Sequence, residues 1–297
     1  MWWALAAATG AQALGKDTLM PGGNTWSVLA LNSYKNVWDQ QDAVCGGGIY
    51  WSRDRNAPQS NQRTFKSLIT QAQYMSLSMK MHSAAKSQVY LDRFNSLSDW
   101  LIASKQVIGG TVLDGLDTAS CSLESTSWTY TYGMLISAYS NSFELIGNRL
   151  HLTRATEIFA MAMATFAPNN IITESCEEAG CSNDARMFKG LLIRSLKELY
   201  RATDDADVKT RIRTIVDANI NAMAAVCDAQ FNCSRFWKAG RMSVDVHSQA
   251  VALELVTTAI AIYAPTNIKT IIKPDNMETS LALKSFGSLL MASLAIL

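Results

Sequence analysis

The segment Cys45-Gly-Gly-Gly-Ile-Tyr-Trp51 has the residue types of a loop that could bind a flat, hydroxyl-rich ligand. Its three consecutive glycines allow positive φ angles and close backbone approach, and its two aromatic side chains supply flat apolar faces. Such a loop suits the rim of a sugar-binding site. The alternative is a tight turn with buried aromatic residues, and these seven residues taken alone favour that alternative.

Cysteine chemistry is the second signal. Six cysteines lie in or beside predicted loops, at Cys45, Cys121, Cys176, Cys181, Cys227 and Cys233. They indicate disulfides and an oxidising compartment, although six cysteines allow fifteen pairings. Low closure cost favours the two short-range pairs, 176 with 181 and 227 with 233, which leaves 45 for 121. The alternative is a zinc site, but C-x-x-C spacing is absent and the histidines are scattered, so we expect no metal.

Composition limits the class of protein. The chain has 297 residues, of which 48% are hydrophobic and 17% charged, and its net charge is +1. This length allows one large domain with a substantial core. The near-zero net charge provides no field that would attract phosphates, so nucleic acid is excluded as an expected partner.

The elements that must position these residues are helices. Apolar residues recur three or four apart, as at Leu68, Ala72, Met75 and Met79, while strict alternation of the strand kind is rare. This periodicity predicts an all-α protein with nine long helices, at residues 2–15, 24–40, 64–86, 88–105, 127–147, 152–166, 184–202, 207–227 and 245–263.

Short and long connections alternate between the predicted helices, which suits stacked helical hairpins. The long connections carry the glycines, cysteines and tryptophans, and they run over residues 42–64, 107–127, 168–183 and 227–243. If they lie at one end of the helical assembly, they form a disulfide-stapled rim rich in aromatic residues.

The two ends of the chain differ from each other. Residues 1–13 imitate a signal peptide but lack a positive residue before the apolar run, so we expect a buried helix. We expect the helical domain to cover residues 1–263, a linker residues 264–284, and an apolar tail residues 285–297. The tail is short for a membrane span and fits a GPI-anchor signal attached near residues 276–280, with a closing amphipathic helix as the alternative.

Four motifs together resemble glycoside hydrolase family 76, the endo-1,6-α-mannanases and related fungal cell-wall proteins. They are Cys45-Gly-Gly-Gly-Ile-Tyr-Trp51, Val112-Leu-Asp-Gly115 followed by Cys121, Trp128-Thr-Tyr130 with Gly133-Met-Leu-Ile136, and Phe188-Lys-Gly-Leu-Leu-Ile-Arg194. The resemblance implies an (α/α)6 toroid, in which six helical hairpins surround a central axis and long loops form the active-site cleft.

The catalytic centre of the resembled family is a pair of adjacent aspartates directly before a helix that begins like Trp2-Trp3-Ala-Leu. By this resemblance the pair would lie immediately before Met1, so we expect no catalytic residue within the chain and an incomplete toroid lacking its first three helices. The adjacent pair that is present, Asp204-Asp205, lacks matching surroundings and reads as a helix cap in a solvated turn. The chain as given is therefore expected to be inactive.

The expected contribution of this chain is glycan binding. Aromatic side chains would stack on sugar faces and polar ones would hydrogen-bond hydroxyls; the candidates are Trp51, Lys66, Asp114, Trp128, Tyr130, Lys189 and Trp237. For each aromatic residue the alternative is a core position, and for Lys189 it is a surface lysine with a buried stem. Altered motif residues, such as Lys66-Ser67 where the family often has Lys-Asn, indicate changed specificity or lost activity.

Three functions remain open. The first is a mannan endo-1,6-α-mannosidase-like protein that hydrolyses or transfers chains on α-1,6-mannan or mannosylated GPI-anchor glycans in fungal cell-wall biogenesis. The second is a non-catalytic mannan-binding relative. The third is an unrelated helical toroid such as a lyase, which would need a pair such as His247 and Tyr130.

For the first two functions we expect a mannan or GPI-glycan partner, no cofactor, and membrane contact only through the lipid anchor. The expected location is secreted or at the cell surface. Asn232-Cys-Ser234 is a candidate glycosylation acceptor.

Overall fold

The computed structural model of the protein describes residues 1–20, 22–54 and 56–264. Within these residues the helices are α1 (Trp2–Leu14), α2 (Trp26–Trp38), α3 (Ser60–Thr64), α4 (Leu68–Ala85), α5 (Gln88–Ala103), α6 (Thr129–Ile146), α7 (Arg149–Phe166), α8 (Phe188–Ala202), α9 (Ala206–Ala224) and α10 (Val246–Tyr263). Two 3₁₀ turns, η1 (Val44–Gly46) and η2 (Asp184–Met187), complete the helical elements. The nine predicted segments are confirmed as the nine long helices of this described part.

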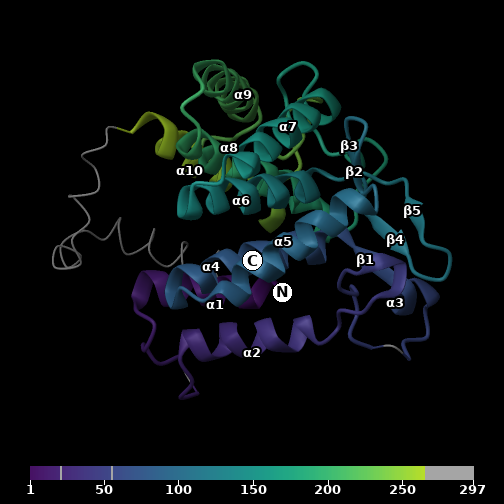
Figure 1. The fold of residues 1–297 in the computed structure, drawn as a ribbon. Coiled ribbons are helices and arrows are strands. Elements are labelled where there is room, and N and C mark those ends of the chain that lie inside the picture. Colours follow the sequence, from purple (N-terminus) through teal and green to yellow (C-terminus); the bar gives the residue numbers. More distant parts are fainter. Residues whose placement is uncertain (21, 55, 265–297) are drawn as a thin grey trace.

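The long helices form two rows. Successive inner helices α1, α4, α6, α8 and α10 pack on one another, while α2, α5, α7 and α9 pack outside them. In Figure 1 the chain climbs from α1 and α2, through α4 and α5, to α7 and α9. The inner helices α4 and α6 are buried along most of their length, whereas α5 buries one stripe through Tyr90, Phe94, Leu97 and Leu101. This arrangement of hairpins is the (α/α)6 toroid pattern, with nine of its twelve long helices among the described residues.

Close packing between the inner helices α6 and α8 depends on a glycine at their contact. A Cβ at Gly133 of α6 would lie 2.6 Å from the backbone oxygen of Leu191 in α8. Any larger residue would force the two helices apart, because real Cβ contacts are not that short. Gly133, one of the motif residues, therefore sets the spacing of the inner row.

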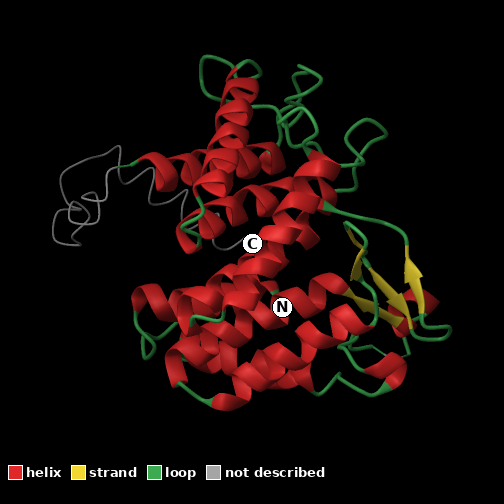
Figure 2. Ribbon diagram, turned by 45° about the horizontal axis from the view of Figure 1, so that its top comes forward, coloured by secondary structure: helices red, strands yellow, loops and turns green. Residues whose placement is uncertain are grey.

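The strands are short and all lie on one side of the helices, as Figure 2 shows in yellow. The strands β1 (Phe65–Ser67), β4 (Gly115–Asp117) and β5 (Ser122–Glu124) form one antiparallel sheet in the order β1-β4-β5. A second sheet pairs β2 (Val107–Ile108) with β3 (Thr111–Val112). The first sheet joins the two long connections before and after the α4–α5 hairpin, and the predicted disulfide Cys45–Cys121 joins the same two connections.

The triple-glycine loop lies against the ring of Trp100. Gly48 has φ +84, and a Cβ there would lie 2.5 Å from that ring. The indole of Trp100 also donates a hydrogen bond to the carbonyl of Cys45, at 3.0 Å. The expected close backbone approach is thus confirmed, and its partner is a tryptophan from α5.

Apolar side chains are exposed on the two helices that end the inner row, as expected for an incomplete toroid. Trp3 and Leu14 are exposed on α1, and Val246, Ile260 and Tyr263 on α10. The predicted linker beyond residue 264 and the apolar tail, with its anchor signal, lie outside the described residues.

Candidate functional site

A cavity of about 720 Å³ lies where four inner helices begin. Its lining includes Trp2 of α1, Thr70 and Gln73 of α4, Tyr130 of α6 and Leu191 of α8, all within two turns of a helix start. The N-terminal ends of helices carry partial positive charge and free backbone N–H groups. The cavity therefore combines polar helix ends with side chains from separate hairpins.

Aromatic rings form one wall of this cavity. The ring of Tyr130 stacks on that of Phe188, with centroids 3.9 Å apart and planes 6° apart, and Trp128 meets Phe188 edge-on at 5.7 Å. Trp51, which is 52% exposed, and Trp3 also line the cavity. The structure thus brings together three of the predicted stacking residues, Trp51, Trp128 and Tyr130, in the arrangement of flat apolar faces that a sugar ring can stack on.

Asp114 lies behind the aromatic wall. Burial raises the pKa of its carboxyl group to about 6, against the opposing effect of hydrogen bonding with Trp128 and Tyr130. Its Oδ1 atom has no hydrogen-bond partner among the described residues. Asp114 is not among the residues that line the cavity, but its carboxyl group is hydrogen-bonded with Trp128 and Tyr130, which do line it.

The raised pKa of Asp114 predicts how the stability of the protein depends on pH. Because the folded state holds this proton up to about pH 6 and the unfolded chain releases it near pH 3.8, stability falls as pH rises between these values. Asp114→Asn removes the charge, so we expect it to raise the free energy of unfolding by about 2 kcal/mol at pH 7.5 and by nothing at pH 3.5. Urea unfolding at both pH values measures this difference.

The exposed Asp204→Asn is the matched control and should change stability at neither pH. A loss of stability in Asp114→Asn at pH 7.5 would show that the ionised carboxylate is required by its neighbours, and would contradict the interpretation.

Lys66 does not lie at the cavity, which corrects the prediction for it. Its side chain is fully buried, and its ammonium donates to Asp42 Oδ1 at 2.5 Å and to the carbonyls of Val44 and Gly47 at 2.9 and 2.7 Å. An ammonium has three donors, and these contacts engage them all. Lys66 therefore fastens the glycine loop to β1 and does not bind sugar hydroxyls.

Lys189 and Trp237 are corrected in the same way. Lys189 is 1% exposed, forms an ion pair with Glu177 at 2.8 Å and donates to the carbonyl of Arg235. The ring of Trp237 is buried 4.1 Å from the ammonium, and its indole donates to the carbonyl of Ser234 at 2.7 Å. The surface-lysine alternative is also wrong, because Lys189 ties the 168–183 connection to the 227–243 connection from inside.

Several cavity residues escaped the sequence analysis. Trp2, Gln73, Asp184 and Phe188 line the cavity, although none was predicted as a binding residue, and Tyr50 lines it as an aromatic residue of the predicted sugar-binding loop. For Trp2 and Phe188 the signal in the sequence was position, because each begins a helix. Gln73 lies inside a buried helical run that contains no hint of a cavity.

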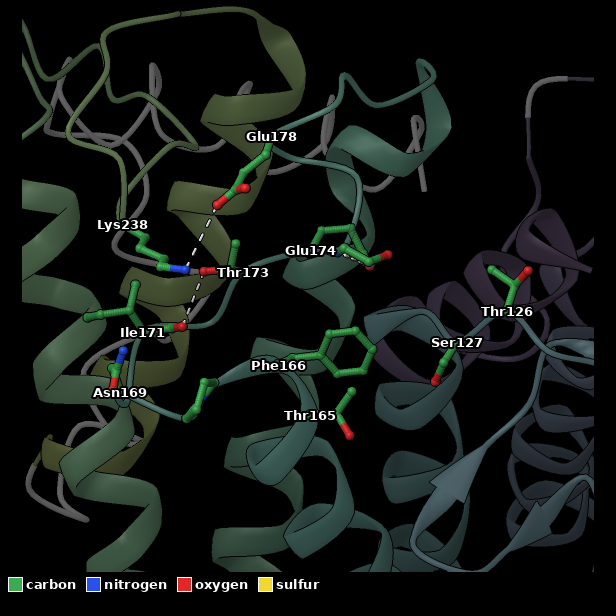
Figure 3. A pocket seen from close by; sticks show the side chains of 12 residues that line it. Thr126, Ser127, Thr165, Phe166, Asn169, Ile171, Thr173, Glu174, Glu178 and Lys238 are labelled. Carbon is green, nitrogen blue, oxygen red and sulfur yellow. Dashed lines mark hydrogen bonds and ion pairs between the residues drawn. The ribbon is translucent and has the colours of Figure 1, made fainter.

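A second cavity, of about 480 Å³, is lined mainly by residues just before α6, at the end of α7 and in the connection that follows α7 (Figure 3). Phe166 forms its apolar part, and Lys238 lies 3.9 Å from Glu178 at its edge. Glu174 lines it too, but this buried carboxylate accepts hydrogen bonds from the backbone and hydroxyl of Thr129. Glu174 therefore caps α6, which has no side-chain cap of its own.

The remaining predicted residues are not among those that line the two cavities. The three disulfides pair as predicted, Cys45–Cys121, Cys176–Cys181 and Cys227–Cys233. Asp205 caps α9 through hydrogen bonds from the N–H groups of Asp207 and Val208, which confirms the cap interpretation. Asn232 is exposed, and its glycosylation stays a prediction.

Known proteins resemble this chain along most of its length. The sequence profile of glycosyl hydrolase family 76 matches residues 1–270. Mannan endo-1,6-alpha-mannosidase DFG5 of Candida albicans is 24% identical over 277 residues, which cover 87% of this chain and 60% of the relative. Mannan endo-1,6-alpha-mannosidase DCW1 of Candida glabrata is 26% identical over 195 residues, covering 63% of this chain and 42% of the relative. The chain thus spans about half the length of these curated relatives.

Solved structures share the fold. Dfg5 from Chaetomium thermophilum, in complex with glucosamine, superposes with a TM-score of 0.75 at 18% identity, covering 88% of this chain and 66% of that one. An inactive variant of the α-1,6-mannanase GH76A of Salegentibacter sp. HEL1_6, in complex with α-1,6-mannotriose, superposes with a TM-score of 0.74 at 15% identity, covering 87% of this chain and 74% of that one. Taken with the match of the family profile to nearly the whole described chain, the fold and the motifs identify this chain as a member of glycosyl hydrolase family 76.

Proposed function

We propose that the cavity at the starts of the inner helices binds α-1,6-linked mannan, and that the protein is mannan endo-1,6-α-mannosidase-like. The observation that carries this proposal is the stacked pair Tyr130 and Phe188 beside Trp128 in a 720 Å³ cavity. Two curated relatives are named as mannan endo-1,6-alpha-mannosidases, and one similar mannanase holds α-1,6-mannotriose. Fungal cell-wall mannan or a mannosylated GPI glycan would supply this ligand.

Cleavage requires more than binding. A retaining glycosidase needs two carboxyl groups about 5 to 5.5 Å apart. Asp184 is the one carboxylate among the described residues that line the cavity. The inactive Salegentibacter variant carries two consecutive aspartates replaced by asparagine. We therefore assign glycan binding and positioning to the residues of this chain, and hydrolysis or glycosyl transfer to an aspartate pair that the family resemblance places immediately before Met1.

Binding is tested by titration calorimetry of the chain with α-1,6-mannotetraose. We expect saturable binding that weakens at least tenfold in Tyr130→Ala, because the stacking face of the cavity is lost. The β-1,4-linked mannotetraose is the control ligand, and we expect it to bind at least tenfold more weakly. Equal affinity for both ligands would contradict the proposal, as would the absence of binding.

Catalysis is tested with α-1,6-mannan as substrate for two proteins. The chain itself should release no oligosaccharides, whereas a version extended before Met1 by a segment that carries the adjacent aspartate pair should release them. Turnover by the unextended chain that is lost in Asp204→Asn or Asp205→Asn would show that the active site lies elsewhere. Glycan binding without turnover in either protein would favour the non-catalytic mannan-binding alternative.

The proposed location is secreted or at the cell surface. Three disulfides close loops at 76, 5 and 6 residues of separation, and such bonds persist in oxidising compartments. A GPI-anchor signal, with its apolar tail at residues 285–297 and lipid attachment near residues 276–280, is part of the same proposal.

A further inference from the structure

Gln73 is a buried glutamine whose amide is not satisfied by the protein. It lies in the second turn of α4, is 4% exposed and contributes to the cavity lining. Its Nε2 atom is buried and has no hydrogen-bond partner among the described residues. A buried polar group without a partner costs about 1 to 3 kcal/mol of stability, so its presence calls for a reason.

Gln71, two residues earlier, shows what a structural glutamine looks like in this helix. Its Nε2 donates to the carbonyls of Ile49 and Ser67 at 2.7 and 3.0 Å, and its Oε1 accepts from the N–H of Ile49 at 2.9 Å. The Gln71 amide therefore holds the glycine loop on α4, and both its nitrogen and its oxygen have hydrogen-bond partners. The contrast indicates that Gln73 does not serve the fold in the same way.

The surroundings of Gln73 define the ligand that would satisfy it. An amide offers both a donor and an acceptor, and a sugar hydroxyl likewise both donates and accepts. The stacked rings of Tyr130 and Phe188 line the same cavity and offer an apolar face. Among the described lining residues the charged side chains are Arg53 and Asp184, of opposite sign, so these side chains together carry no net charge that would select a charged ligand.

We propose that Gln73 is a specificity-determining residue of the cavity, whose amide hydrogen-bonds the hydroxyls of the bound mannosyl unit. This inference rests on the proposed function, since it names the residue that reads the glycan bound there. A mannosyl unit bound in the cavity would give the Gln73 amide its missing hydrogen-bond partner. The free energy that the unpaired amide costs the free protein is then regained on binding, and it favours ligands that can make this hydrogen bond.

The test measures affinity and stability together in Gln73→Met, which keeps the side-chain length and removes the amide. We expect the Kd for α-1,6-mannotetraose to rise tenfold to a hundredfold, while the midpoint of thermal unfolding stays the same or rises. A purely structural amide would give the reverse, a lower midpoint with unchanged Kd, and that result would overturn the inference.

Two control variants separate the roles. Gln71→Met should lower the midpoint of unfolding, because it breaks three hydrogen bonds that hold the loop. Ser140→Ala removes another buried, unpartnered polar atom that does not line the cavity, and it should leave Kd unchanged. Wild-type protein that fails to bind mannotetraose would contradict the proposed function as well, whereas wild-type affinity retained in Gln73→Met contradicts this inference alone.

A measurement without mutation gives the same distinction if Gln73→Met fails to fold. In NMR spectra of the wild-type chain, the side-chain amide resonances of Gln73 should shift on addition of mannotetraose, while those of Gln71 should stay. An unmoved Gln73 amide in the saturated complex would overturn the inference.

Discussion

Replacing Cys45 and Cys121 together by serine should lower the free energy of unfolding by about 4 to 5 kcal/mol, because a loop of this length strongly restricts the unfolded chain. The disulfide closes a separation of 76 residues that includes α4 and α5. It also joins the glycine loop to the β4–β5 hairpin, beside the cavity residues Tyr50 and Trp51. Urea unfolding of the double variant measures the loss.

The disulfide Cys227–Cys233 provides the comparison. Its separation is 6 residues, so the corresponding double serine variant should lose only about 2 kcal/mol, by the same loop-entropy relation. Equal losses for the two disulfides would show that native contacts, and not loop closure, dominate. We also expect the Cys45 and Cys121 double variant to bind mannotetraose more weakly, since its glycine loop keeps only noncovalent ties.

Lys189→Met should lower the free energy of unfolding by about 3 to 5 kcal/mol, the cost of breaking a buried ion pair from one side. Burial lowers the pKa of Lys189, and the nearby carboxylate of Glu177, 2.8 Å away, opposes that effect. Without the ammonium, Glu177 is left 6% exposed and the carbonyl of Arg235 loses its donor. Thermal unfolding at pH 7 measures the loss.

A second substitution tests the cause. Adding Glu177→Gln to Lys189→Met removes the uncompensated charge and should restore more than half of the lost stability. Lys238→Met, on an exposed lysine 3.9 Å from Glu178, should change stability by less than about 0.5 kcal/mol. A double variant as unstable as Lys189→Met would show that packing against Trp237, and not charge, explains the loss.

The helices could be predicted from the sequence because their apolar spacing is local. Boundaries shifted where tertiary structure intervened: the segment expected to start at residue 64 begins its helix at Leu68, since Phe65–Ser67 pairs with Gly115–Asp117 as β1 and β4. Strands of two or three residues are too short to show alternation, so no sequence pattern indicated them.

The candidate site was predictable only in part. Trp128 and Tyr130 belong to a motif at the start of α6, and Trp51 belongs to the glycine loop; all three line the cavity. Lys66 and Lys189 looked like sugar-binding residues, because the sequence does not show that their ion-pair partners Asp42 and Glu177 lie 24 and 12 residues away in other loops. Gln73 gave no signal at all, since an unsatisfied amide is visible only once every neighbour is placed.

The order of the inner helices has a consequence for biosynthesis. Each inner helix packs on the one before it in the sequence, from α1 to α4, α6, α8 and α10. As the chain emerges from the ribosome, each new inner helix therefore finds the helix on which it packs already synthesised. Few contacts depend on residues that are made much later. Residue 121 follows α5 and precedes α6, so both cysteines of the Cys45–Cys121 bond are present before the second half of the inner row has been synthesised, and we expect the bond to form at that stage.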